Sequence, residues 1–243
     1  MKFGVKNFDD EKFFDYFVGK ADFFEVQAIR GNDYSYLQKY VEKGIPIIVH
    51  AEHQGFGVNH CDPKKERVNL ESIAFSRGLA DKVNAEFIIV HPGRIYDKDC
   101  SLAYFIKTFQ KINDPRIVIE NLPQSIDRSF FSPAASPDYI KYILDNLGCG
   151  FCFDINHASR SYGENSLGFE VFCKKFLDLK PVHFHLCGEK DNRTIEHINL
   201  RDSELDIELV KRILPCDANV TLEVSIDEKE VEKDLEFARD KLG

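Results

Sequence analysis

The sequence predicts an α/β protein folded as a single (β/α)8 TIM barrel that spans residues 1–243. Short apolar segments alternate with longer amphipathic segments from one end of the chain to the other, as in a parallel sheet wrapped by helices. The length of 243 residues is close to the roughly 250 typical of one such barrel. An open doubly wound sheet usually has a Gly-rich turn after its first strand, whereas this chain runs from Lys6 to Asp9 without glycine.

Eight apolar segments of four to six residues are expected to form the strands. They are rich in Val, Ile and Phe, as strands buried on both faces of a parallel sheet usually are. The expected strands cover residues 2–5, 22–27, 46–50, 87–91, 116–120, 150–154, 181–186 and 220–224.

The segments between these strands have the spacing of amphipathic helices, most clearly at residues 66–83, 137–147, 204–214 and 227–242. At the second of these, Ser136 is a good helix cap and Pro137 suits the first turn. Counting gives eight helices that alternate strictly with the eight strands. No linker, repeat or low-complexity segment divides the chain, so one domain is expected.

Composition limits the class of partner. Hydrophobic residues make up 43% of the chain, enough for a sizeable core, and the formal net charge is −9, from 41 acidic and 32 basic residues. An acidic chain repels nucleic acid at long range unless bound metals or a basic patch reverse the field. No segment is long and apolar enough to cross a membrane, and seven scattered cysteines fit a reducing cytoplasmic setting. No protein partner can be inferred.

Side chains that bind metals stand at the ends of six consecutive expected strands. Barrel enzymes build their sites at the C-terminal ends of the strands, so these side chains should share one rim. They are His50, His91, Glu120, Asp154, His185 and Glu223. Any one of them has a structural explanation, since an acidic residue can cap a helix and a lone histidine is often a core residue. Burying three carboxylates together is costly without cations, so the set predicts divalent metal ions.

Other histidines lie near the same rim. His157 follows Asp154 by three residues, and His197 lies in the loop after the seventh strand, so both are candidate ligands as well as candidate solvated residues. His183 shares a strand face with His185 one layer deeper and is expected to be packed. His53 and His60 lie in a loop and are expected to be exposed, with His53 close enough to His50 to touch a substrate.

Several of these motifs are specific as a set. They are Val90-His91-Pro92-Gly93, Ile119-Glu120-Asn121, Phe153-Asp154-Ile155-Asn156-His157-Ala158 and His185-Leu186. In order and spacing the chain from Pro46 to Val224 resembles the xylose-isomerase-like barrel superfamily, and within it the endonuclease IV branch, the type 2 apurinic endonucleases.

The resemblance implies a three-metal site, with zinc as the expected ion. In its pattern His50 and His91 hold one metal, and Glu120 bridges to a second. Asp154, His185 and Glu223 complete the coordination of the second metal. His157 and His197 hold the third, together with an Asp two residues before the last histidine.

Three departures from the endonuclease IV pattern bear on the substrate. Ile195 stands at the position of the third-site Asp and cannot bind a metal, and Asp191 or Glu196 could replace it only with a changed geometry. The first strand reads Phe3-Gly4-Val5-Lys6 in place of a Gly-Ala-His signature, and His53 replaces a tyrosine that helps to hold distorted DNA. The loops that grip a duplex also look short.

The resemblance leaves two enzymatic functions open. The first is hydrolysis of a phosphodiester, such as abasic DNA, by two or three zinc ions, with Glu120, Glu223 and His157 as catalytic residues. Eight of the nine ligands expected for it are present.

The second is isomerisation or epimerisation of a small sugar or sugar phosphate with one Mn or Mg ion. That ion would bind Glu120, Asp154, His185 and Glu223. Glu120 and Glu223 would exchange a proton at carbon, and His157 would contact a sugar hydroxyl. Lys190 or Arg193 is then a candidate for binding a substrate phosphate. A third class, a metal-binding barrel without catalysis, also stays open, although no core ligand is replaced.

Overall fold

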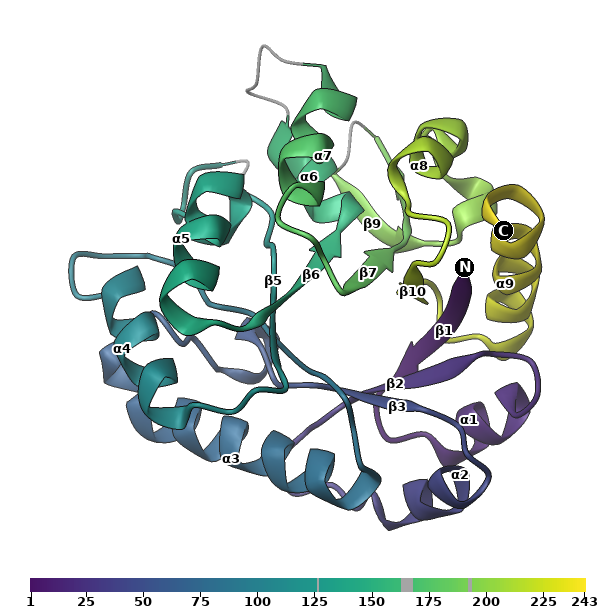
Figure 1. Cartoon of the computed structure of the whole chain (residues 1–243), viewed down its shortest axis with the longest axis horizontal. Coiled ribbons are helices and arrows are strands. Elements are labelled where there is room, and N and C mark those ends of the chain that lie inside the picture. Colours follow the sequence, from purple (N-terminus) through teal and green to yellow (C-terminus); the bar gives the residue numbers. More distant parts are fainter. Residues whose placement is uncertain (126, 163–167, 192–193) are drawn as a thin grey trace.

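The chain folds as a closed barrel of eight parallel strands, which confirms the predicted fold class (Figure 1). The computed structural model describes residues 1–125, 127–162, 168–191 and 194–243. Around the barrel the strands follow the order β1-β10-β7-β6-β5-β4-β3-β2, so the first and last strands of the chain lie side by side. The barrel strands are β1 (Lys2–Asn7), β2 (Phe23–Gln27), β3 (Ile47–His50), β4 (Ile88–Val90), β5 (Ile117–Glu120), β6 (Gly150–Asp154), β7 (His183–Leu186) and β10 (Asn219–Leu222).

Helices form the outer ring of the barrel, and the described residues contain nine α-helices. They are α1 (Glu11–Phe17), α2 (Gln38–Glu42), α3 (Glu66–Val83), α4 (Leu102–Ile112), α5 (Pro137–Leu147), α6 (Ile155–Tyr162), α7 (Phe169–Leu177), α8 (Ile207–Ile213) and α9 (Glu228–Leu242). None of them combines the length and the apolar composition that a membrane-spanning helix needs.

The strict alternation expected from the sequence is wrong in the second half of the barrel. Two helices, α6 and α7, separate β6 from β7, because α6 starts directly at the end of β6 and Gly168 begins a second helix. A small antiparallel hairpin of β8 (Gly188–Lys190) and β9 (Ile195–Ile198) also lies between β7 and α8.

Element ends differ from the expected ones by a few residues. Strand β4 ends at Val90 and β10 at Leu222, so His91 and Glu223 are the first residues beyond their strands. Helix α8 begins at Ile207 rather than at residue 204, because the side chain of Asp206 accepts hydrogen bonds from the next backbone amides and caps the helix there.

The apolar core has two parts. The larger part fills the space between the strands and the surrounding helices, and includes Phe14, Phe24, Phe153 and Phe176. The smaller part is a separate cluster of strand residues, which we call the lower barrel layer: Phe23, Ile48, Ile89, Val118 and Cys152. In this layer the ring of Phe23 covers Gly4 so closely that a Cβ on Gly4 would lie 2.1 Å from it.

Candidate metal centre

Polar side chains form a second layer directly above the lower barrel layer. Successive strand residues point to opposite faces, so the residue two positions further along each strand faces the same interior. These positions carry Lys6, Glu25, His50, His91, Glu120, Asp154, His185 and Glu223. Six of them are the predicted strand-end ligands, while Lys6 and Glu25 were not predicted. Five of them, Glu25, His50, Glu120, Asp154 and His185, are almost completely buried.

His50, His91 and Glu120 form the first group of possible ligands. Nε2 of His50 lies 3.1 Å and Nε2 of His91 lies 2.9 Å from Oε2 of Glu120. Nδ1 of His50 donates to the carbonyl oxygen of Ala51 at 2.8 Å, so in the neutral ring Nε2 carries a lone pair. That lone pair faces a carboxylate oxygen, and two acceptors at this distance need either a proton or a metal ion between them. Burial lowers the pKa of His91 to about 4, which leaves its ring neutral and able to bind a metal.

Glu120, Asp154 and His157 form the second group. Oε1 of Glu120 lies 3.1 Å from Nδ1 of His157, and Oδ2 of Asp154 lies 3.4 Å from the same nitrogen. The His157 Nδ1 donates to the carbonyl of Asn121 at 2.8 Å, and the His157 backbone amide donates to Asp154. Burial raises the pKa of Asp154 to about 6, and the carboxylates of Glu120 and Glu223 add to the rise. A nearby cation would lower this pKa again, because it favours the ionised carboxylate.

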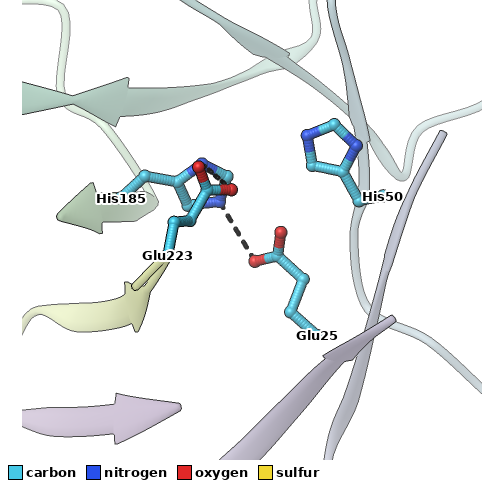
Figure 2. A group of neighbouring side chains, drawn as sticks. All are labelled: Glu25, His50, His185 and Glu223. Carbon is cyan, nitrogen blue, oxygen red and sulfur yellow. Dashed lines mark hydrogen bonds and ion pairs between the residues drawn. The ribbon is translucent and has the colours of Figure 1, made fainter. Parts of the chain in front are cut away.

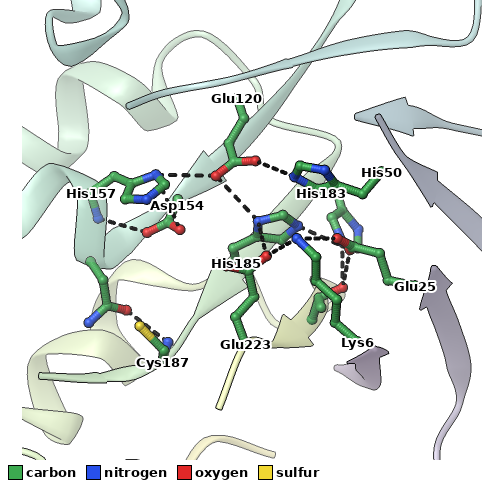
Figure 3. Close-up of polar contacts among 12 residues, drawn as sticks. Lys6, Glu25, His50, Glu120, Asp154, His157, His183, His185, Cys187 and Glu223 are labelled. Atoms are coloured by element: carbon green, nitrogen blue, oxygen red, sulfur yellow. Dashed lines mark hydrogen bonds and ion pairs between the residues drawn. The ribbon is translucent and has the colours of Figure 1, made fainter. Parts of the chain in front are cut away.

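Glu25, His50, His185 and Glu223 form the third group, drawn in Figure 2. His185 lies between two carboxylates, with Nε2 at 3.0 Å from Oε2 of Glu25 and Nδ1 at 3.2 Å from Oε1 of Glu223. Figure 3 shows that the ammonium of Lys6 reaches this group: it pairs with Glu223 and lies 3.2 Å from Oε1 of Glu25.

The charges in this layer suit bound divalent cations. Four carboxylates, on Glu25, Glu120, Asp154 and Glu223, lie close together, and in the described part of the chain Lys6 is the one Lys or Arg side chain that pairs with them. The buried atoms Oε1 of Glu120 and Nδ1 of His185 make no hydrogen bond to any described residue, although they lie 3.5 Å apart. Oxygen and nitrogen donors directed at a common space are what a zinc-type ion requires. The residues therefore fit the metal ions expected from the sequence.

The structure brings seven of the eight candidate ligands into these three groups and leaves His197 outside them. The side chain of His197 is 48% exposed on β9, and its Nδ1 contacts the backbone carbonyl of Glu223 at 3.0 Å. Ile195, at the position of the missing Asp, is also exposed. Glu196 pairs with Arg160, so it is not a free replacement. The third site of the resemblance stays a prediction, with His157 directed at Glu120 and Asp154.

The other histidines have structural environments. His183 is buried as expected, and its Nε2 lies 2.8 Å from the hydroxyl of Thr221. The expectation that His60 is exposed is wrong: it is buried, because its ring packs 5.1 Å from that of Phe109, and burial lowers its pKa to about 3. The ring centroid of His53 lies 6.1 Å from that of His50, close to the candidate centre.

Two residues of the centre, Glu25 and Lys6, were not predicted from the sequence, because the prediction rested on metal-binding residue types at the strand ends. Glu25 lies two residues before the end of β2, and Lys6 lies one before the end of β1. The signal that would have found them is the period of two along a strand, counted from Phe23 and Gly4 in the lower barrel layer.

A cavity of about 680 Å³ opens directly above the candidate ligands. Most candidate ligands line it, together with Lys6, Arg94 and the rim residues Phe8, Tyr96 and Ile226. Its volume lies within the range of sites for small molecules. The centre is therefore accessible to a ligand from the C-terminal face of the barrel.

Comparison with known proteins places the chain in a family. Endonuclease IV from Thermus thermophilus is similar in structure with a TM-score of 0.78 and 17% identity, covering 100% of this chain and 99% of that chain. A D-tagatose 3-epimerase-like protein has a TM-score of 0.69 and 18% identity, covering 100% of both chains. The IOLI protein with a binding zinc atom has a TM-score of 0.68 and 14% identity, covering 99% of this chain and 96% of that chain. These identities show a shared fold alone.

No curated protein matches the sequence. The sequence model of the xylose isomerase-like TIM barrel family, by contrast, matches residues 14–241, which include every barrel strand except the first. With its closed parallel barrel, the chain belongs to the xylose isomerase-like TIM barrel family.

Proposed function

We propose that this protein is a metal-dependent phosphodiester hydrolase of the endonuclease IV type, with two zinc-type ions that share Glu120. One observation carries the proposal: the two carboxylate oxygens of Glu120 face different sets of nitrogen atoms. Oε2 faces Nε2 of His50 and of His91, whereas Oε1 faces Nδ1 of His185, with the N–H at Nδ1 of His157 beside it. An enzyme with one metal ion has no need of the first set.

Two ions held in this way would acidify a water molecule and neutralise the charge of a phosphoryl group. The protein's part is to hold the ligands in one protonation state and one orientation. The carbonyl oxygen of Ala51 accepts a hydrogen bond from Nδ1 of His50 and so fixes the proton of His50 on that nitrogen. The carboxylate of Glu25 accepts a hydrogen bond from Nε2 of His185. The ammonium of Lys6 places a positive charge beside Glu223, where it can stabilise negative charge on a bound phosphate.

The alternative is a sugar or sugar-phosphate isomerase with a single Mn or Mg ion, and a second observation favours it. Glu120 and Glu223 approach the same nitrogen of His185, at 3.5 and 3.2 Å, so two carboxylates flank one point above the barrel. A pair of carboxylates in this position suits proton removal and return at adjacent carbons. The D-tagatose 3-epimerase-like protein has the same fold.

Metal analysis of the purified protein, followed by two assays, tests the proposal. Two or more zinc-type ions per chain, with hydrolysis of a phosphodiester such as bis(p-nitrophenyl) phosphate or abasic-site DNA, support the hydrolase. About one manganese or magnesium ion with conversion of a ketose supports the isomerase. A protein that retains no metal after reconstitution contradicts both functions.

A further inference from the structure

Arg94 lies on the wall of the cavity and is not among the candidate metal ligands. It follows His91 by three residues, and both side chains line the cavity above Glu120. The rim beside it is apolar and partly exposed at Tyr96 and Phe8. A ligand that reaches Glu120 therefore passes a guanidinium group and an aromatic surface.

The positive charge of Arg94 has no acidic partner in the described part of the chain. No described carboxylate lies within 4.0 Å of it, whereas Lys6, the other basic side chain that lines the cavity, already pairs with Glu25 and Glu223. The Nε of Arg94 is buried and makes no hydrogen bond. Its guanidinium carbon lies 4.1 Å from the ring centroid of Phe130, so one face of the group is stacked, and no described residue accepts a hydrogen bond from its nitrogen atoms.

The backbone at Arg94 is held rigidly, which distinguishes it from a solvated loop arginine. The buried Asn59 bonds both backbone groups of residue 94: Nδ2 donates to the carbonyl at 2.9 Å, and Oδ1 accepts from the amide at 2.9 Å. Asn69 in turn accepts from the Asn59 amide at 3.0 Å. Gly93 has φ of +113°, and a Cβ there would lie 2.2 Å from Oδ1 of Asn59, so only glycine permits this arrangement.

We propose that Arg94 forms an anion-binding subsite that holds a phosphate or carboxylate group of a small substrate whose reacting centre lies at Glu120. This inference rests on the proposed function and narrows its substrate class. A planar guanidinium with free donors binds such a group through two parallel hydrogen bonds. The cavity of about 680 Å³ accommodates a small molecule, and the net charge of −9 opposes a long polyanion. The apolar rim then contacts the uncharged part of the substrate.

Calorimetric titration of the purified full-length protein with inorganic phosphate, and separately with succinate, tests the subsite. The Arg94→Gln variant is compared with wild type at equal measured metal content, and should bind one of these anions about ten-fold or more weakly. Arg94→Lys keeps the positive charge but loses the two parallel donors of the guanidinium, so its anion affinity should lie between those of wild type and Arg94→Gln. Arg67→Gln is the matched control, since Arg67 is an exposed arginine on α3, and it should bind both anions as wild type does.

The two anions separate the sources of the anionic group. If Arg94→Gln weakens phosphate binding alone, the anionic group is a phosphate. If it weakens succinate binding alone, the group is a carboxylate. Either outcome supports the subsite. Unchanged binding of both anions in Arg94→Gln overturns it, as does a loss of duplex DNA binding with phosphate and succinate binding intact. Failure of the proposed function appears elsewhere, as fewer than two metal ions per chain or no phosphodiester hydrolysis by wild type.

Discussion

Nε2 of His185 lies 3.0 Å from Oε2 of Glu25, while Nδ1 of the same ring faces Oε1 of Glu223 at 3.2 Å. The Glu25 oxygen also accepts a hydrogen bond from the hydroxyl of Thr221 at 2.7 Å, and the other oxygen faces Lys6. Glu25 is thus fixed from three sides and in turn orients His185. Carboxylates placed behind a metal-binding histidine fix the tautomer and raise the basicity of the ligand nitrogen.

Glu25→Gln should therefore weaken metal binding, although Glu25 is not one of the eight ligands predicted from the sequence. The amide keeps the volume of the side chain but loses the charge, so zinc affinity should fall about 10- to 100-fold. Competition with a chelating dye measures the change. Asp234→Asn is a matched control, because Asp234 is a fully buried carboxylate that pairs with Arg201 away from the centre. Equal zinc affinity in Glu25→Gln and wild type would show that Glu25 does not act through His185.

His50→Ala separates the two candidate functions. It removes one nitrogen from the set around Oε2 of Glu120 and leaves Asp154, His185 and Glu223 in place. If the protein is a hydrolase, the variant should retain about one metal ion fewer per chain and lose most phosphodiester hydrolysis. Elemental analysis and the hydrolysis assay measure both effects.

His60→Ala is the control for this change, because His60 is an equally buried histidine that belongs to none of the ligand groups. It should keep its metal content. A His50→Ala protein with unchanged metal content and activity would contradict the two-metal arrangement. Retained ketose conversion in the same variant would favour the isomerase.

Much of the centre could be predicted because the geometry of a parallel barrel does most of the positioning. Any polar residue at a C-terminal strand end reaches the same rim, so His50, Glu120 and Asp154 could be grouped from the sequence alone. Glu25 was not predicted because it lies two residues before the end of its strand. Lys6 was not predicted because it follows the expected strand end at Val5 and lysine is not a metal-binding residue type. Finding them requires knowing which face of β1 and β2 is internal, and each strand has buried residues on both faces.

The segments outside the barrel strands could not be predicted as well. The position of the His197 side chain depends on how the hairpin of β8 and β9 lies beside β10. This is a tertiary contact, and no sequence pattern indicates it. The helix α6 was missed because it continues from β6 without an intervening loop signal. The prediction of Arg193 as a phosphate ligand lies outside the described residues, and Lys190 does not line the cavity.

Asp114 should make the stability of the fold depend on pH. Hydrogen bonds from Arg116, and from Arg77 at 2.8 Å, lower the pKa of this buried carboxyl below its ordinary value despite the opposing effect of burial. Since the folded pKa is the lower one, the stabilisation is complete above the unfolded pKa of about 4 and is lost as the pH falls below it. Asp114→Asn should therefore lower the unfolding free energy by about 1.5–3 kcal/mol at neutral pH.

Urea unfolding of both proteins at several pH values measures this effect. The difference between wild type and Asp114→Asn should narrow from about pH 5 to about pH 3 as the wild-type carboxylate loses its advantage. Asp81→Asn is the control: Asp81 also pairs with Arg116 but is 69% exposed, so its removal should cost less than about 1 kcal/mol. A difference that stays constant over this pH range would mean that the charge of Asp114 does not stabilise the fold.

Gly93→Ala should disturb both the fold and the anion subsite. The alanine must adopt φ near +113°, and its Cβ would lie 2.2 Å from Oδ1 of Asn59. This oxygen accepts the hydrogen bond from the backbone amide of Arg94. Strain and loss of this hydrogen bond should lower the unfolding free energy by about 1–3 kcal/mol. Because Arg94 then loses its fixed position, the affinity for the anion that Arg94 binds should fall as well. Thermal unfolding and calorimetric titration measure the two effects on the same sample.

Gly78→Ala provides the opposite expectation at a matched substitution. Gly78 lies inside helix α3, and a Cβ there meets nothing within 4 Å. Alanine at an interior helix position should stabilise the protein by about 0.5–1 kcal/mol and leave anion binding unchanged. If Gly93→Ala binds the anion as tightly as Gly78→Ala does, the two hydrogen bonds from Asn59 to the backbone of residue 94 do not position the guanidinium. The rigidity argued for the subsite would then be wrong.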